Sequence, residues 1–258
     1  MNLDVAITKA KIEYDNLQQA PREAQLNAKY GLADLQPDEI TRLYISQEYE
    51  GVLPDFSLFP CLVEFSCSKE LPFEYFRDQN MTEIKKLRIA VNCHQDRLSI
   101  NAPALHEIVI YPSSGSGRDL FNTSNKEIIF DGAPLLEAVC IRRNSVFDVS
   151  SIRSLRKLRR LTIFDGIVPE NVIHDELESL DDLCISDCEL TNIDFLKVGC
   201  NLQHLDLNRN FIRVFDRVAS FPRLKRLIIY ENPIQNEVFL RQLGINELII
   251  NQRDKILA

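Results

Sequence analysis

A pattern of about 22 residues recurs along this chain, and it limits the possible folds more than any other feature of the sequence. Residues 202–212 read LQHLDLNRNFI and residues 224–234 read LKRLIIYENPI, and both fit L-x-x-L-x-L-x-x-N-x-I. Copies of the pattern begin at positions 40, 62, 84, 105, 136, 158, 180, 202, 224 and 245. Ten starts at nearly constant spacing are typical of a chain that stacks one structural unit on the next.

Each unit divides into a strand and a turn region. The fourth and sixth residues of L-x-x-L-x-L point to the same side of a strand, and in one copy these are Leu205 and Leu207. The second half of the unit carries apolar residues at every third position, as in Phe215, Val218 and Phe221. A period of three suits extended or 3₁₀-like turns better than full α-helices.

The two complete copies at 202 and 224 resemble the leucine-rich-repeat family, in its short class of about 22 residues, as in the protein-phosphatase regulatory subunit and the internalins. The resemblance covers residues 40–258. It implies an α/β solenoid: a curved horseshoe of about ten repeats with a concave parallel β-sheet, and with turns and 3₁₀ segments on the convex side. The first four copies depart from the pattern, because only Asn92 occupies the asparagine position there.

Three segments lie outside the regular repeat. We expect residues 1–39 to form an N-terminal helical cap, because Ile7, Ala10, Tyr14 and Leu17 have the spacing of an amphipathic helix. A separate targeting or partner-binding helix is the alternative. The step from 105 to 136 carries nine extra residues, which predicts a loop insertion near 113–132. The chain ends in a final strand and a short amphipathic tail.

Composition limits the partners. With 30 basic and 38 acidic side chains the net charge is −8, which argues against nucleic acid or an anionic membrane as a bulk partner. The sequence has no run of 18 apolar residues and no secretory signal at its start. We therefore expect a soluble, monomeric, cytoplasmic protein that binds neither nucleic acid nor membrane. Non-classical secretion as an effector stays open.

The sequence contains no recognisable catalytic signature. Its seven cysteines are an odd number without a Cys-x-x-Cys pair, which predicts reduced thiols rather than disulfides or a zinc site. His204 would project beside Asp182 and Asp206, but a solvated histidine is the favoured interpretation. We expect no cofactor, no metal and no enzymatic activity. The alternative is an enzyme whose site lies in the segments outside the repeats.

Equal repeat positions should lie side by side on the concave face, roughly 4.8 Å apart. The third position then forms a row of largely alternating charge from Arg42 to Glu247, with opposite pairs worth about 0.2–1 kcal/mol each. The basic run SIRSLRKLRR looks like a nucleic-acid patch when read linearly. In the repeat frame, however, Arg159 and Arg160 stand beside Asp181 and Asp182, which should neutralise them.

The fifth and seventh positions are mostly uncharged, and several of them carry large side chains on the face that should be exposed. Val109, Tyr111, Arg142 and Phe164 lie there on neighbouring central strands. Ile228 and Tyr230, with Ile249, form a second such group near the C-terminus. Exposed apolar, Tyr and Arg side chains are typical of protein interfaces. We therefore expect a module that binds a protein on its concave face. The alternative is a bacterial or pathogen effector, or an immunity-type protein, acting on a host or toxin protein.

Overall fold

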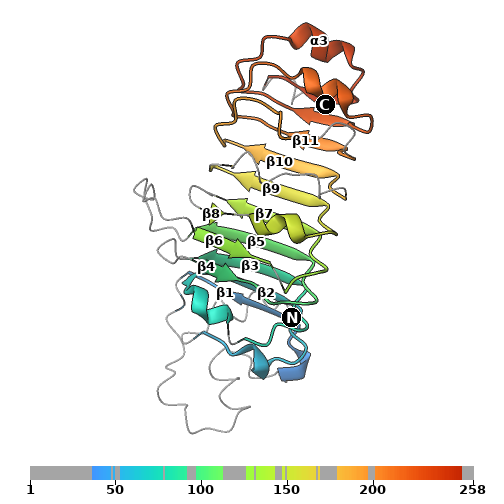
Figure 1. Cartoon of the computed structure of the whole chain (residues 1–258). Helices are drawn as coiled ribbons and strands as arrows, with labels where there is room; N and C mark the ends of the chain where they lie inside the picture. The colour runs from blue at the N-terminus through green and yellow to red at the C-terminus, as the bar shows by residue number, and fades with distance from the viewer. Residues whose placement is uncertain are drawn as a thin grey trace.

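The chain forms a ladder of ten parallel strands that runs from one end of the molecule to the other (Figure 1). The computed structural model describes residues 37–47, 49, 53–77, 79–91, 97–112, 126–130, 132–142, 147–148, 150–166, 168, 179–196 and 201–251. Each predicted repeat contributes one strand to this sheet. In spatial order the strands are β1 (Arg42–Ile45), β2 (Glu64–Leu71), β3 (Lys86–Val91), β5 (Glu107–Pro112), β7 (Ala138–Arg142), β9 (Arg160–Phe164), β10 (Asp182–Ser186), β11 (His204–Asp206), β12 (Arg226–Ile228) and β13 (Glu247–Ile249).

The strand register confirms the repeat frame. Arg42 pairs with Glu64, Glu64 pairs with Lys86, and the third position of each later repeat pairs with the third position of the next, as far as Glu247. The single long step of 31 residues does not break this order, because Glu107 still pairs with Ala138. The extra residues therefore leave the sheet without disturbing it.

One backbone carbonyl at the start of each strand accepts two hydrogen bonds from the next coil. The carbonyl of Arg159 accepts from the N–H groups of Asp181 and Asp182, both at 3.0 Å, and the same arrangement recurs from Thr41 to Gln203. A slip of one residue would turn every core side chain toward solvent, so these paired bonds and the buried face specify the same register.

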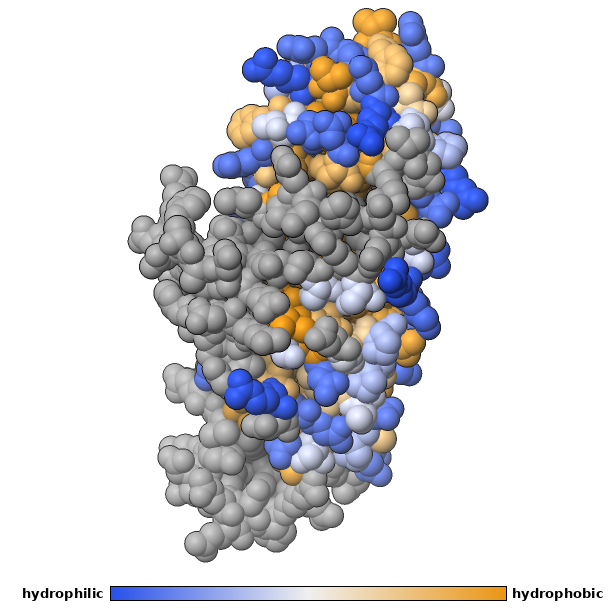
Figure 2. Space-filling model, in the orientation of Figure 1, coloured by the Kyte–Doolittle hydropathy of each residue, from blue (hydrophilic) through white to orange (hydrophobic). Residues whose placement is uncertain are grey.

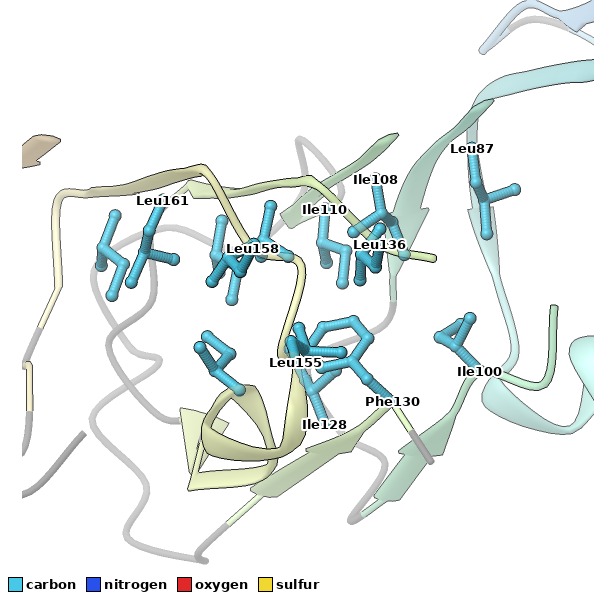
Figure 3. Packing of buried hydrophobic residues seen from close by; sticks show 14 of the residues in the cluster. Leu87, Ile100, Ile108, Ile110, Ile128, Phe130, Leu136, Leu155, Leu158 and Leu161 are labelled. Carbon is cyan, nitrogen blue, oxygen red and sulfur yellow. The ribbon is translucent and has the colours of Figure 1, made fainter. Parts of the chain in front are cut away.

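The core lies between the sheet and the opposite wall of the solenoid. Figure 3 shows two layers of side chains facing each other there, with Ile108, Ile110 and Leu161 reaching from the sheet toward Ile128 and Phe130. All five are buried. Burial of one such side chain contributes about 1.5–3 kcal/mol, and one coil shares its buried surface with both neighbours.

Short 3₁₀ helices form much of the wall opposite the sheet, as the three-residue period predicts. Phe215, Val218 and Phe221 are buried on and around one of them, where every third side chain faces the core. The last complete coil instead contains a short α-helix, α3 (Glu237–Gln242). The 3₁₀ helices are η2 (Pro37–Glu39), η3 (Phe56–Leu58), η4 (Phe73–Phe76), η6 (Ser150–Ser154) and η7 (Asp216–Ser220).

A second parallel sheet, not anticipated from the sequence, covers the middle of the solenoid. It consists of β4 (Arg97–Ser99), β6 (Lys126–Ile129) and β8 (Phe147–Asp148), in that order. β6 lies inside the segment predicted as a loop insertion at 113–132, so that prediction is wrong for Lys126–Ile129. The physical reason is the apolar sequence Ile128-Ile129-Phe130, which the core buries. Residues 113–125 lie outside the described residues.

The predicted ends are only partly described. Of the helical cap expected over residues 1–39, residues 1–36 lie outside the described residues, and the remainder is η2. The final strand is confirmed as β13, and residues 252–258 of the tail lie outside the described ranges. Within the described residues, no helix combines the length and apolar character needed to cross a membrane.

Candidate protein-binding surface

The third repeat position forms the predicted row of charges on the sheet face that is turned away from the core, which is the face that the sequence predicts to be concave. Ion pairs join neighbouring strands at both ends of the row, and all of them are partly exposed, so each adds little to stability. Their N···O distances are 3.4 Å for Arg42–Glu64, 3.7 Å for Lys86–Glu107 and 3.1 Å for Arg226–Glu247. In the same row, Nδ1 of His204 lies 3.9 Å from the carboxylate of Asp182.

The row of charges is interrupted at β7. Its third position is Ala138, which is buried between Glu107 and Arg160 in the register. Two residues further along β7, Cys140 lies between Val109 and Thr162, and all three are half-buried. The third and fifth repeat positions of β7 therefore carry small, uncharged side chains at the middle of the sheet.

Arg142 and Phe164 stand at the seventh position of adjacent strands and pair in the register. Phe164 is 37% exposed, and Arg142 is exposed without an ion pair to any described residue. Val109 and Tyr111 lie on β5, which pairs with β7, and we call these four residues the central patch. The register places them on three neighbouring strands, as the sequence predicts, and their role in binding stays a prediction.

Tyr111 is less exposed than the sequence frame predicts. Its hydroxyl group donates a hydrogen bond to the carbonyl oxygen of Cys67 at 2.9 Å and lies 3.4 Å from the hydroxyl of Ser68. The side chain therefore leans across Ala90 on β3 toward β2. Burial raises the pKa of the Tyr111 hydroxyl, and the hydrogen bond with Ser68 acts in the opposite direction.

An irregularity in β2 explains this contact. The register shifts between Cys67 and Glu70, so Glu70, and not Ser68 as the repeat frame predicts, pairs with Ala90. The two inserted residues are held in place, because the Lys69 amine donates to the carbonyl of Tyr49 at 2.9 Å. β-Bulges re-aim side chains, and this one brings Ser68 within reach of Tyr44 and Tyr111.

The second predicted group, near the C-terminus, is not an exposed surface. Ile228 is only 8% exposed and Ile249 is buried, so the prediction that they face solvent is wrong. Tyr230 is half-buried and has a contact partner. These residues offer little apolar area to a partner, and the central patch is the better candidate.

A network of polar side chains, which was not predicted from the repeat pattern, borders the central patch. Ser186 follows Phe164 at the seventh position and donates to the amide oxygen of Asn208 at 2.8 Å, and both residues are buried. The amide nitrogen of Asn208 in turn donates to Asp206 at 2.5 Å. Because these groups bind one another, the patch ends at Phe164. Polar residues at equal positions of consecutive repeats were the signal for this network.

The asparagines that recur at the ninth repeat position have a structural role. The buried amide nitrogen of Asn210 donates to the carbonyls of Ile185 and Leu207 at 2.8 and 2.9 Å, and its oxygen accepts from the N–H groups of Cys188 and Leu190. Asn232 does the same one coil later, donating to the carbonyls of Leu207 and Ile229 and accepting from Ile212. A ladder of asparagines that bind backbone across coils, together with parallel strands at a 22-residue spacing, decides the fold. The chain is a leucine-rich-repeat solenoid.

No family model matches the sequence, and no curated protein matches it significantly. Among solved structures, an internalin of Listeria monocytogenes is similar at 13% identity, with 84% of this chain and 82% of that chain covered and a TM-score of 0.43.

Two further solved structures are similar. TLR13 in its complex with ssRNA13 shares 16% identity, with a TM-score of 0.49, over 82% of this chain and 36% of that chain. A leucine-rich-repeat protein of Leptospira interrogans shares 14% identity, with a TM-score of 0.37, over 97% of this chain and 81% of that chain. The fold assignment rests on the strand register and the asparagine ladder.

The other residues considered for metal binding, thiol chemistry or nucleic-acid binding are exposed to solvent or buried. Within the described part of the leucine-rich-repeat solenoid, no three His, Cys, Asp or Glu side chains are grouped as metal ligands. The described cysteines are free thiols, and burial raises the pKa of Cys67, Cys184 and Cys188 to about 12. The predicted neutralisation of the basic run is confirmed for Arg159, which binds Asp181 at 2.6 Å, and is wrong for Arg160, which makes no ion pair with Asp182.

Proposed function

We propose that the chain is a non-enzymatic protein-interaction module that binds a protein partner on its concave face, at the central patch. The observation that carries this proposal is the pairing of a partly exposed Phe164 with Arg142, which has no ion pair among the described residues, on adjacent central strands. Aromatic and arginine side chains at the middle of a surface are the residue types that most often contribute binding energy.

The surroundings of the patch support this role. Lys86 and Glu107 are paired with each other on one side of the patch, and Arg160 and Asp182 add charged groups on the other side, so the patch has a polar rim. Ala138 and Cys140 on β7 are small and uncharged, so they place no charged group beneath a partner at the middle of the sheet. Arg142 can bind a carboxylate of the partner through two parallel N–H groups, a geometry that lysine cannot supply.

Apolar surface also occurs away from the concave face. Figure 2 shows apolar residues among charged ones at the end of the molecule that carries α3. Val238 on α3 is strongly exposed, and Phe211 is 61% exposed in the turn that follows Asn210. Phe211 therefore provides a matched control, because it is the same residue type at an exposed position outside the sheet.

Affinity capture with three forms of the full chain tests the proposal. The baits are the wild type, Phe164→Asp and Phe211→Asp, and bound proteins are identified by mass spectrometry. We expect at least one protein that the wild type and Phe211→Asp retain and that Phe164→Asp loses. If every captured protein also binds Phe164→Asp, the concave site is wrong. The origin of the partner, from the same cell or from a host or competitor, separates a regulatory subunit from an effector or immunity-type protein.

A further inference from the structure

A second candidate site lies at the edge of the sheet where the strands begin. A groove of about 430 Å³ runs there across four coils. One wall is formed by the second residue of each repeat, including Glu137, Arg159 and Asp181. The other wall is formed by the residue that precedes each repeat, and its two outer members are Lys157 and Arg223.

Most polar groups in the groove already have partners. Arg159 and Asp181 form an ion pair at 2.6 Å, and the Ser179 hydroxyl donates to the carbonyl of Arg156 at 3.0 Å. The backbone carbonyls at this edge each accept two N–H groups from the next coil, so no β-strand can be added to them. Lys157 and Arg223 differ, because both are exposed and neither forms an ion pair or hydrogen bond with a described residue.

The distance between Lys157 and Arg223 indicates how far apart two negative groups of a ligand must be to contact both. Lys157 and Arg223 occupy the same repeat position three coils apart, which corresponds to about 14 Å at the usual distance between strands. An extended peptide advances about 3.3 Å per residue, so two acidic side chains four residues apart span a similar length. We propose that this groove binds an extended acidic peptide segment, with one carboxylate at Lys157 and another at Arg223.

Charges in the groove favour a peptide over nucleic acid. Glu137 and Asp181 also line it, and they would repel a continuous row of phosphates. Among the lining residues there is no aromatic side chain on which a base could stack. The net charge of −8 opposes an acidic peptide only weakly, because salt screens exposed charges that lie more than about 10 Å from the peptide. The site is separate from the central patch and does not depend on the function proposed for it.

Fluorescence anisotropy of a labelled peptide tests this site on the full chain. The probe is a Gly/Ser peptide with two glutamates at positions i and i+4, and the comparison peptide carries them at i and i+1. We expect the first peptide to bind more tightly, and Lys157→Glu and Arg223→Glu each to weaken it about tenfold or more. Lys157→Gln should weaken it less, whereas Arg213→Glu should leave it unchanged, since Arg213 is an exposed cation that does not line the groove.

The same measurement can overturn the proposal. Absence of peptide binding at low salt, or equal binding by the wild type and both Glu variants, would contradict it. A single-stranded oligonucleotide serves as competitor, and tighter binding of it with the same loss in both variants would assign the groove to nucleic acid instead. Thermal melts of each variant show whether the fold is retained, and a variant that does not fold is replaced by its Gln counterpart.

Discussion

The hydroxyl group of Tyr111 on β5 donates a hydrogen bond to the carbonyl oxygen of Cys67 on β2, 2.9 Å away, across the intervening strand β3. This contact makes Tyr111 part of the solenoid as well as part of the central patch. Tyr111→Phe removes the hydrogen bond and leaves the ring, so we expect the free energy of unfolding to fall by about 0.5–1.5 kcal/mol. Urea denaturation measures the change, and a variant as stable as the wild type would show that the contact is not formed in solution.

The asparagine ladder gives a larger expected effect. Asn210 is buried and makes hydrogen bonds to backbone groups of its own coil and of the preceding coil. Asn210→Ala leaves several of these groups without a partner, which should lower the free energy of unfolding by about 2–4 kcal/mol. Asn192→Ala is the control, because the Asn192 side chain is exposed and accepts one local hydrogen bond from Asp194. Equal losses in the two variants would contradict the structural role of the ladder.

Buried thiols predict how stability depends on pH. Burial raises the pKa of Cys67, Cys184 and Cys188 from the ordinary value of 9.0 to about 12. The folded chain therefore keeps these protons at pH values where the unfolded chain releases them. Their contribution to stability is complete below about pH 9 and is lost as the pH rises toward 12, by up to about 1.4 kcal/mol per pH unit for each thiol.

Urea denaturation of the reduced protein at about pH 8 and about pH 10 measures this loss. Cys188→Ala should be less stable than the wild type at both pH values, because it removes a buried side chain, but its stability should fall less between them. A decrease that is equal in the variant and the wild type would show that the Cys188 thiol does not contribute.

Two residues of β9 test which side chains face the core and which face the opposite side of the sheet. Leu161 is fully buried, and Leu161→Ala should lower the free energy of unfolding by about 2–5 kcal/mol. Phe164 is 37% exposed, so Phe164→Ala should lower it by about 1 kcal/mol or less. Thermal or urea denaturation compares them directly. If Phe164→Ala were as destabilising as Leu161→Ala, the side chain would belong to the core.

The sequence predicts the features that repeat in every coil, such as the strand register. It does not predict features that occur in one coil only, such as the bulge in β2. Strand register follows from the spacing alone, because Leu205 and its equivalents must all face the core, and a slip of one residue would expose them. The bulge at Ser68 and Lys69 was not predicted, because inserted residues leave no mark in a pattern that continues normally afterwards. The place of Tyr111 depends on that bulge, so its partial burial was not predicted either.

Exposure was the other quantity that the sequence could not supply. Position in the repeat indicates which way a side chain points, but neighbouring side chains decide how much of it water reaches. Ile228 and Phe164 both point to the concave side, yet one is 8% and the other 37% exposed. The second sheet was missed for a related reason, since three short strands on the outer wall are separated by segments of unequal length.

Affinity of the captured partner for two phenylalanine variants tests the central claim most directly. Isothermal titration calorimetry would compare the wild type with Phe164→Ala and Phe211→Ala. We predict that Phe164→Ala weakens binding by about 1–4 kcal/mol, or about 5- to 1,000-fold, while Phe211→Ala changes it by less than about twofold. Unchanged affinity in Phe164→Ala, or a loss confined to Phe211→Ala, would contradict binding at the central patch and move the site to the flank of the solenoid near α3.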